Sequence, residues 1–165
     1  MNLRALYNFC GKLDLTIRCN SNILQTFYTD KGIGGKTLKV ISLQISAREL
    51  FLHPNRSNYH LFRQLCHELG HYLIAPPGRR HREDYGIPNE AKRKASANPK
   101  WDLDELKACL IENHLSGKFG GKYLKNPLSR NIYSRARLHI PTANQWWKET
   151  GQEMIDRILK EHNVK

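Results

Sequence analysis

Apolar residues recur at the spacing of an amphipathic helix in four stretches of the chain. The pair Pro76-Pro77 is expected to end the second of these helices, and Gly117 to end the third. Ser57 and Asn58 can cap the start of the second helix, and Pro141 precedes the fourth. The pattern therefore predicts helices over about 1–11, 57–75 and 102–116, and from Thr142 onward.

Between the first two helices the pattern changes to short β-rich pieces. These are Leu13–Arg18, Thr26–Thr29 and Thr37–Ile45, with a glycine-rich turn at 30–35 before the last. We expect an α+β fold in which a small antiparallel or mixed sheet backs the helix over 57–75, as in zincin-like proteins. The whole chain, 1–165, is expected to be one domain, since 165 residues is an ordinary single-domain length.

Composition narrows the class of protein. No apolar run approaches the roughly 18 residues that a membrane span needs. The N-terminus lacks the features of a secretory signal. The four cysteines form no Cys-x-x-Cys pair, so we expect reduced thiols. A soluble, cytoplasmic protein is the expectation.

The net charge of +12 is unevenly distributed. The loop over 76–100 is basic, the segment 101–114 is acidic, and the segment 115–141 contains no carboxylate. We call 115–141 the basic segment. Its cations alternate with aromatic residues, which suits a nucleic-acid backbone or an acidic protein. The candidate partner surface comprises Lys118, Lys122, Lys125, Arg130, Arg135 and Arg137.

The second helix carries the sequence His67-Glu68-Leu69-Gly70-His71, an HExxH motif. Residues four apart lie on one face of a helix, so both imidazoles can reach one metal ion. Glu68 lies about 100° round the same turn, where it can act as a general base without being a ligand. The motif predicts a metal site with Glu68 as its catalytic residue.

A two-histidine site needs a third protein ligand and at least one open position. The residues alone leave several choices open: Glu105, Glu112, Asp84, His81, His114 and His60. Glu105 and Glu112 are seven apart and share a face of the third helix, which can pack across the second. Near the metal, Arg79 and Arg80 can hold an anionic substrate. Asp84 can orient a ligand imidazole or accept from Arg80.

The run from His67 to Ala75, the pair Arg79-Arg80 and the sequence Glu83-Asp84-Tyr85-Gly86 resemble the elongation factor P hydroxylase family. That family shows an HExxH helix, an Ile-Ala step, paired arginines and an Asp-aromatic-Gly. Glu105-Leu106-Lys107 lies 34 residues after His71, close to the Glu-x-Lys that supplies the family's carboxylate ligand. The resemblance implies that His67, His71 and Glu105 bind Fe(II) and that the protein hydroxylates a lysine of an acidic elongation factor.

Three functions remain in view at this point. The first is an iron-dependent hydroxylase of a macromolecular substrate, as the resemblance implies. The second is a zinc metallopeptidase, because HExxH followed by a glutamate on a later helix is also the gluzincin arrangement with Zn(II). The third is a non-catalytic nucleic-acid or protein-binding module in which the metal is structural.

Overall fold

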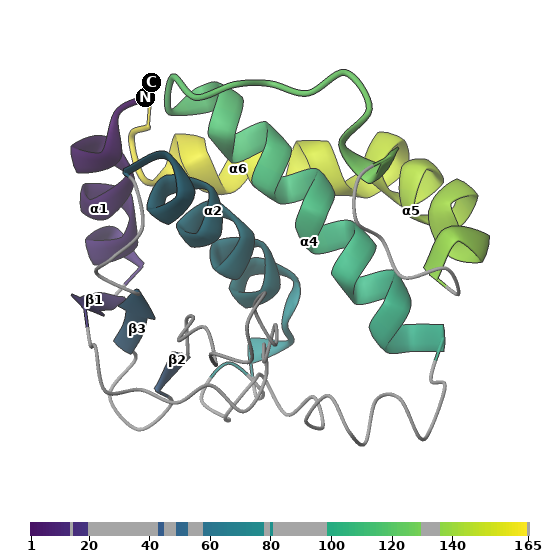
Figure 1. Cartoon of the computed structure of the whole chain (residues 1–165), viewed down its shortest axis with the longest axis horizontal. Helices are drawn as coiled ribbons and strands as arrows, with labels where there is room; N and C mark the ends of the chain where they lie inside the picture. The colour runs from purple at the N-terminus through teal and green to yellow at the C-terminus, as the bar shows by residue number, and fades with distance from the viewer. Residues whose placement is uncertain are drawn as a thin grey trace, which may run out of the picture.

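The computed structural model describes residues 1–13, 15–19, 43–44, 49–52, 58–77, 80, 99–129 and 136–164. Its helices are α1 (Leu3–Lys12), α2 (Asn58–Ile74), α4 (Pro99–Lys118), α5 (Ile140–Trp146) and α6 (Gln152–Glu161). Two short 3-10 turns, η3 (Pro127–Ser129) and η4 (Ala136–His139), lie between α4 and α5. A π-helical turn, η5 (Trp147–Gly151), joins α5 to α6. Figure 1 shows α2 and α4 side by side along the same diagonal, with α6 behind them and α5 on the far side of α4.

The predicted helices are confirmed, although their ends differ in detail. Helix α2 matches the predicted range within a residue at each end. Helix α4 does not stop at Gly117 but continues through Lys118. The stop lies at Gly120, which has φ of 74°, while the amides of Gly120 and Gly121 donate to the carbonyls of Gly117 and Ser116. This pair of bonds is a Schellman motif, and it needs a residue with positive φ that glycine adopts without strain.

The expected α+β fold, with a sheet backing the metal helix, is wrong: the described part of the chain is mostly helical. Three strands are present, β1 (Thr16–Cys19), β2 (Leu43–Gln44) and β3 (Glu49–Leu52), in the order β1-β3-β2. Strand β3 runs parallel to β1 and antiparallel to β2. A four-residue strand spans about 13 Å, whereas the 17 residues of α2 span about 26 Å, so these strands are too short to cover the helix. Helix α2 packs mainly on α4 instead. The predicted strand Thr26–Thr29 lies outside the described residues.

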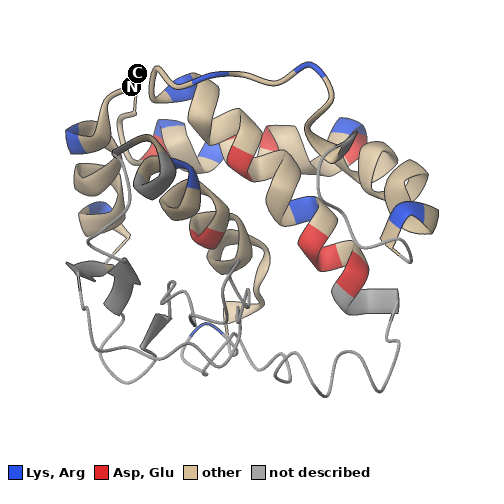
Figure 2. Ribbon diagram, in the orientation of Figure 1, with Lys and Arg blue, Asp and Glu red and all other residues tan. Residues whose placement is uncertain are grey.

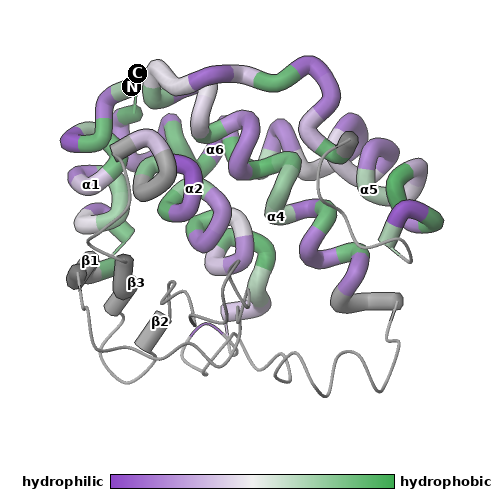
Figure 3. The backbone as a smooth tube through the Cα atoms, in the orientation of Figure 1, coloured by the Kyte–Doolittle hydropathy of each residue, from purple (hydrophilic) through white to green (hydrophobic). Residues whose placement is uncertain are grey.

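Helices supply the buried residues of the main core, apart from a few residues at helix ends and in connections. That core includes Leu6, Phe9, Phe62, Leu65, Leu69, Ile111, Leu115, Phe119, Ile155 and Leu159. A smaller cluster contains Leu106, Leu110, Leu128, Ala136 and Ala143. Helix α4 belongs to both clusters and is therefore buried on two sides. Figure 3 shows the consequence: hydrophobic and hydrophilic stretches alternate along α2 and α4.

Candidate metal centre

Two stripes of polar side chains face each other where α2 and α4 pack. On α2 the stripe is Arg63, His67 and His71, and on α4 it is Glu105, Cys109 and Glu112. Each stripe follows one helix face, because its members are three or four residues apart. Arg63 contacts Glu112, whereas His71 contacts Glu105. The two helices are therefore antiparallel at the site.

A glycine allows the two helices to approach closely. A Cβ atom built on Gly70 would lie 2.8 Å from the carbonyl oxygen of Ala108 and 3.0 Å from its Cα. Any side chain at position 70 would collide with the backbone of α4. The small residue Ala108, which is fully buried, faces it. This close approach brings the two polar stripes within contact distance of each other.

Three side-chain groups converge at the centre of the stripes. The Nε2 atoms of His67 and His71 are 3.1 Å apart. Glu105 places Oε1 3.2 Å from Nε2 of His67 and Oε2 3.2 Å from Nε2 of His71. The two imidazole rings are nearly perpendicular, with an interplanar angle of 88°.

These separations fit a metal ion. Two ligands at 2.0–2.1 Å from a tetrahedral zinc ion are about 3.3 Å apart, and neighbouring ligands of an octahedral iron ion are about 3.0 Å apart. The observed 3.1–3.2 Å lies between these two values. The nitrogen and oxygen donors of His67, His71 and Glu105 thus have the identity and the spacing of a facial two-histidine, one-carboxylate ligand set.

Glu112 and Arg63 support His67 from the other side. Oε2 of Glu112 lies 3.2 Å from Nδ1 of His67, and Oε1 lies 2.6 Å from the guanidinium of Arg63. When Nδ1–H donates to Glu112, the Nε2 lone pair of His67 points toward the centre, as a metal ligand requires. The salt bridge with Arg63 balances the negative charge of Glu112. Glu112 therefore acts on the site indirectly, through its contact with His67.

The electrostatics of the centre favour an ionised Glu105. Burial by itself would raise the pKa of this carboxyl, but the adjacent imidazoles of His67 and His71 outweigh that effect and hold the pKa well below its usual range. An anionic oxygen is the form that binds a metal ion. Glu105 is therefore in the ionised form that a metal ligand needs at neutral pH.

Cys109 is a residue of this cluster that the sequence reading did not assign to the site. Its Sγ atom, one ligand nitrogen of His67 and one carboxylate oxygen of Glu105 all lie within 4.8 Å of one another. Burial raises the pKa of the Cys109 thiol, and a hydrogen bond with His67 opposes that rise. The available signal was its spacing four residues after Glu105, which places both on one helix face.

The other proposed ligands lie elsewhere or outside the described residues. His114 forms a hydrogen bond with Asp156 of α6 through its Nε2 atom, at 2.8 Å, and not with His67. Glu68, the predicted catalytic residue, lies in the helix turn that carries the two histidines and is buried. His81 and Asp84 lie outside the described residues, as does Arg79, and the side chain of His60 is not described either.

Arg80 binds backbone carbonyl groups at the end of α2. Its Nε atom donates to the carbonyl of Ala75 at 3.0 Å and its Nη2 atom to the carbonyl of Leu73 at 3.3 Å. The guanidinium also lies 4.9 Å from the ring centroid of Tyr72. A cation here satisfies carbonyls that the last turn of a helix leaves without intrahelical partners. Arg80 thus contacts the carboxyl end of α2, and these bonds hold its guanidinium there.

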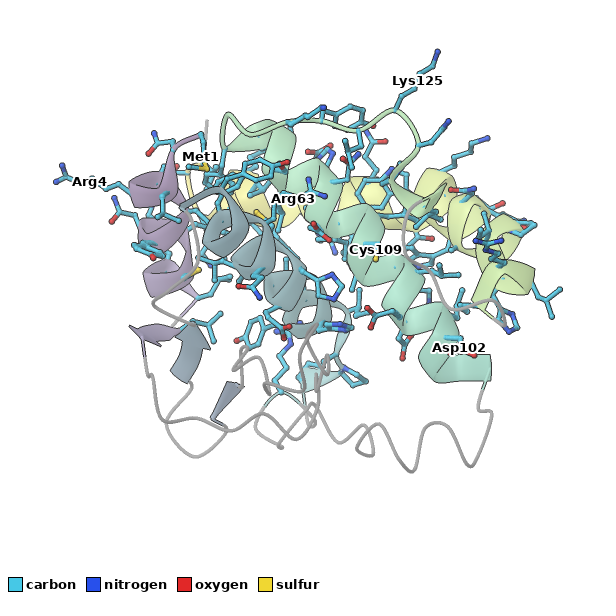
Figure 4. The ribbon with its side chains drawn as sticks, in the orientation of Figure 1. Met1, Arg4, Arg63, Asp102, Cys109 and Lys125 are labelled. Atoms are coloured by element: carbon cyan, nitrogen blue, oxygen red, sulfur yellow. The ribbon has the colours of Figure 1, made fainter. Side chains whose placement is uncertain are left out.

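The charged residues separate along the molecule, as Figure 2 shows: acidic residues gather in the first turns of α4, and basic residues mark the connection that follows it. Lys118, Lys122, Lys125 and Arg137 are exposed. Lys118 forms an ion pair with Asp156, at 3.2 Å. Figure 4 labels Lys125 and Asp102 at opposite ends of this arrangement. Arg130 and Arg135 lie outside the described residues.

A cavity of about 560 Å³, whose lining does not include His67, His71 or Glu105, lies between α1 and residues 163–164. Phe9, Phe119, Lys12 and Asn163 are among the residues that line it. The ammonium group of Lys12 is already bonded to the carbonyl of His162, at 2.6 Å. The cavity therefore shares no residue with the metal centre.

Among the described residues no helix is long and apolar enough to cross a membrane. Comparison of the chain with protein-family models, with curated proteins and with solved structures finds no match.

Proposed function

We propose that the chain is a mononuclear metalloenzyme in which His67, His71 and Glu105 hold the metal ion. One observation carries this proposal: two imidazole nitrogens and both oxygens of one carboxylate converge with separations of 3.1–3.2 Å. Three acceptor groups that converge between two packed helices are stabilised by a cation at their centre. The HExxH spacing and the glutamate of the following helix support the same conclusion.

The surrounding residues have distinct roles in this proposal. Glu112 keeps His67 in the tautomer that presents Nε2, and Arg63 holds Glu112 in place. Glu68, buried in the same turn, is the residue that we expect to exchange a proton with the substrate or with water. The two ligand histidines lie on the part of α2 where Gly70 lets the helix pack closely on α4.

The reaction that we propose first is iron-dependent hydroxylation of a macromolecular substrate. Ferrous iron held by two histidines and a carboxylate supplies oxygen-activating chemistry in many enzymes. Support comes from this ligand set and from the resemblance of the HExxH region to elongation factor P hydroxylases. The exposed Lys122 and Lys125 would favour an acidic protein as the substrate. Such a substrate would place the protein in the cytoplasm.

A zinc hydrolase is the second proposal, and one observation favours it. Glu68 follows His67 directly and is buried in the helix turn of the two ligands, the position from which a general base serves hydrolysis. Hydrolysis requires such a base, whereas oxygen insertion does not obviously need one. A purely structural metal, linking α2 to α4, is the remaining alternative.

Metal analysis of protein purified anaerobically tests the proposal. Iron near one atom per chain supports the hydroxylase, and zinc retained through dialysis supports the hydrolase. If wild-type protein contains neither iron nor zinc, the metalloenzyme proposal is wrong. Incubation of acidic protein substrates with iron, reductant and oxygen, followed by mass spectrometry, then identifies the reaction.

The variant Glu68→Gln separates the two reactions. In a hydrolase it should keep the metal and abolish cleavage, because the base is lost and no ligand is. In a hydroxylase it should leave partial activity and a product heavier by one oxygen atom. Peptide fragments that disappear in Glu68→Gln would contradict the hydroxylase. No reaction with either metal would favour the structural role.

A further inference from the structure

Cys109 provides a sulfur donor beside the proposed ligand set. Its Sγ atom lies within 4.8 Å of ligand atoms of both His67 and Glu105, so these three residues form a second potential metal-binding group. The pair His67 and Glu105 is common to both groups. Figure 4 marks Cys109 on α4 and Arg63 on the facing helix α2.

We propose that Cys109 is a fourth protein ligand when the site holds zinc, so that zinc is bound by a closed shell of His67, His71, Glu105 and Cys109. This inference rests on the metal centre proposed above and adds the selection of its metal; because it leaves zinc no open position, it argues against the zinc hydrolase. A sulfur and a nitrogen ligand of one tetrahedral zinc ion are about 3.6 Å apart. The Sγ atom, now within 4.8 Å of the ligand atoms of His67 and Glu105, has to move toward the centre, and rotation about the single side-chain torsion of the cysteine is the movement that this requires.

The chemistry of the donors makes this ligand selective. Thiolate sulfur is a soft donor that zinc binds readily, whereas nitrogen and oxygen donors suit ferrous iron. On binding zinc the thiol loses its proton to solvent and no electron is transferred. With iron, the site would keep three ligands and an open face. With zinc, the thiolate would occupy that face, and the centre would lose the open position that catalysis requires.

The position of Cys109 distinguishes it from the other described thiols. Cys10 and Cys66 are fully buried in the hydrophobic core, and burial raises the pKa of Cys10 to about 12. Cys109 is partly exposed and lies on the polar stripe between Glu105 and Glu112. Cys66 precedes His67 directly but belongs to the core cluster, which makes it a matched control.

Cobalt(II), a spectroscopic substitute for zinc, tests the proposal. We expect wild type and Cys66→Ala to show a sulfur-to-cobalt charge-transfer band in the near ultraviolet. Cys109→Ala and Cys109→Ser should lose this band and keep the visible bands of bound cobalt. Their zinc affinity should fall at least about tenfold, and their iron(II) affinity should change by less than about threefold.

A second measurement uses the wild-type chain alone. Zinc should slow the reaction of Cys109 with a maleimide reagent, as followed by peptide mass mapping, and Glu105→Gln should remove that protection. Cobalt that binds without a sulfur band, together with unprotected Cys109, would overturn the fourth ligand and leave the three-ligand centre standing. Absence of any cobalt binding would overturn both.

Discussion

At the residue scale, Glu105 and Glu112 show how two carboxylates seven residues apart can have different roles. Glu105 contacts the Nε2 atoms of both histidines, whereas Glu112 contacts Nδ1 of His67. We expect Glu105→Gln to lower metal occupancy about as much as His67→Ala, because a ligand and its charge are both lost. Glu112→Gln keeps an oxygen that can accept from Nδ1 and should cost about tenfold in affinity or less.

Titration of the metal into each refolded variant, with the bound metal counted per chain, measures this difference. The thermal unfolding of each variant without metal serves as the control for general damage. If Glu112→Gln empties the site while Glu105→Gln stays loaded, the ligand assignment is wrong.

At the element scale, the contact between α2 and α4 depends on Gly70. An alanine there would bring Cβ to 2.8 Å from a backbone oxygen of α4, which side-chain movement does not relieve. We expect Gly70→Ala to destabilise the fold by about 1–3 kcal/mol and to weaken metal binding, because the helices must separate. The matched control is Gly11→Ala in α1, where nothing lies within 4 Å of the added atom.

In Gly11→Ala the gain in helix propensity, about 1 kcal/mol, should leave stability equal or higher. Thermal unfolding with and without metal compares the two variants. Equal unfolding temperatures for Gly70→Ala and wild type would show that the helices do not need this close approach.

A second contact between elements joins α4 to α6. Asp156 accepts from His114 at 2.8 Å and from Lys118 at 3.2 Å. Burial opposes the ionised form of Asp156, but the hydrogen bonds from His114 and Lys118 outweigh this effect and lower its pKa from the ordinary 3.8. The pKa of the folded state therefore lies below that of the unfolded chain.

This contribution to stability is complete above pH 3.8 and is lost as the pH falls through the lowered pKa of the folded state. We expect Asp156→Asn to lower the unfolding temperature at neutral pH and to differ less from wild type as the pH falls below 3.8. Glu153→Gln, an exposed acid on the same helix, is the control. A difference that does not vary with pH would contradict the role of this carboxylate.

At the scale of the whole molecule, the described part of the basic segment is attached to α4 at a distance from the candidate metal centre. The side-chain amide of Asn113 donates to the carbonyl of Leu124, at 3.0 Å, and its oxygen accepts from the Leu124 amide, at 2.7 Å. These two bonds attach part of the basic segment to α4. Asn113 lies eight residues after Glu105, which corresponds to about 12 Å along the helix.

If this surface binds an anionic macromolecule, neutralising its lysines should weaken association and flatten the dependence on salt. Because Lys118 is paired with Asp156, we expect Lys122→Gln with Lys125→Gln to account for most of the effect. Binding to an acidic protein and to nucleic acid at several salt concentrations measures it, with Lys160→Gln on α6 as the control. Unchanged binding and metal content would show that these charges serve solubility alone.

The sequence by itself determined the helices and placed His67 with His71, and Glu105 with Glu112, on shared helix faces. Periodicity identifies the face of a helix, and the HExxH spacing places two histidines on one face of α2 without knowledge of any neighbour. The same reasoning assigned Glu105 and Glu112 to one face of α4. These are local properties, because backbone geometry alone relates residues three or four apart.

Only the tertiary structure decided which partner each face meets. Periodicity does not encode the register between α2 and α4, which is set by contacts between the two helices, the close packing of Gly70 on Ala108 among them. That register brings Glu105 to both imidazoles, Glu112 to Nδ1 of His67 and Cys109 beside them. The prediction of a sheet behind α2 was wrong for the same reason. The apolar face of α2 indicated which side of the helix is buried, but contacts between residues distant in the chain determined that helices cover that side.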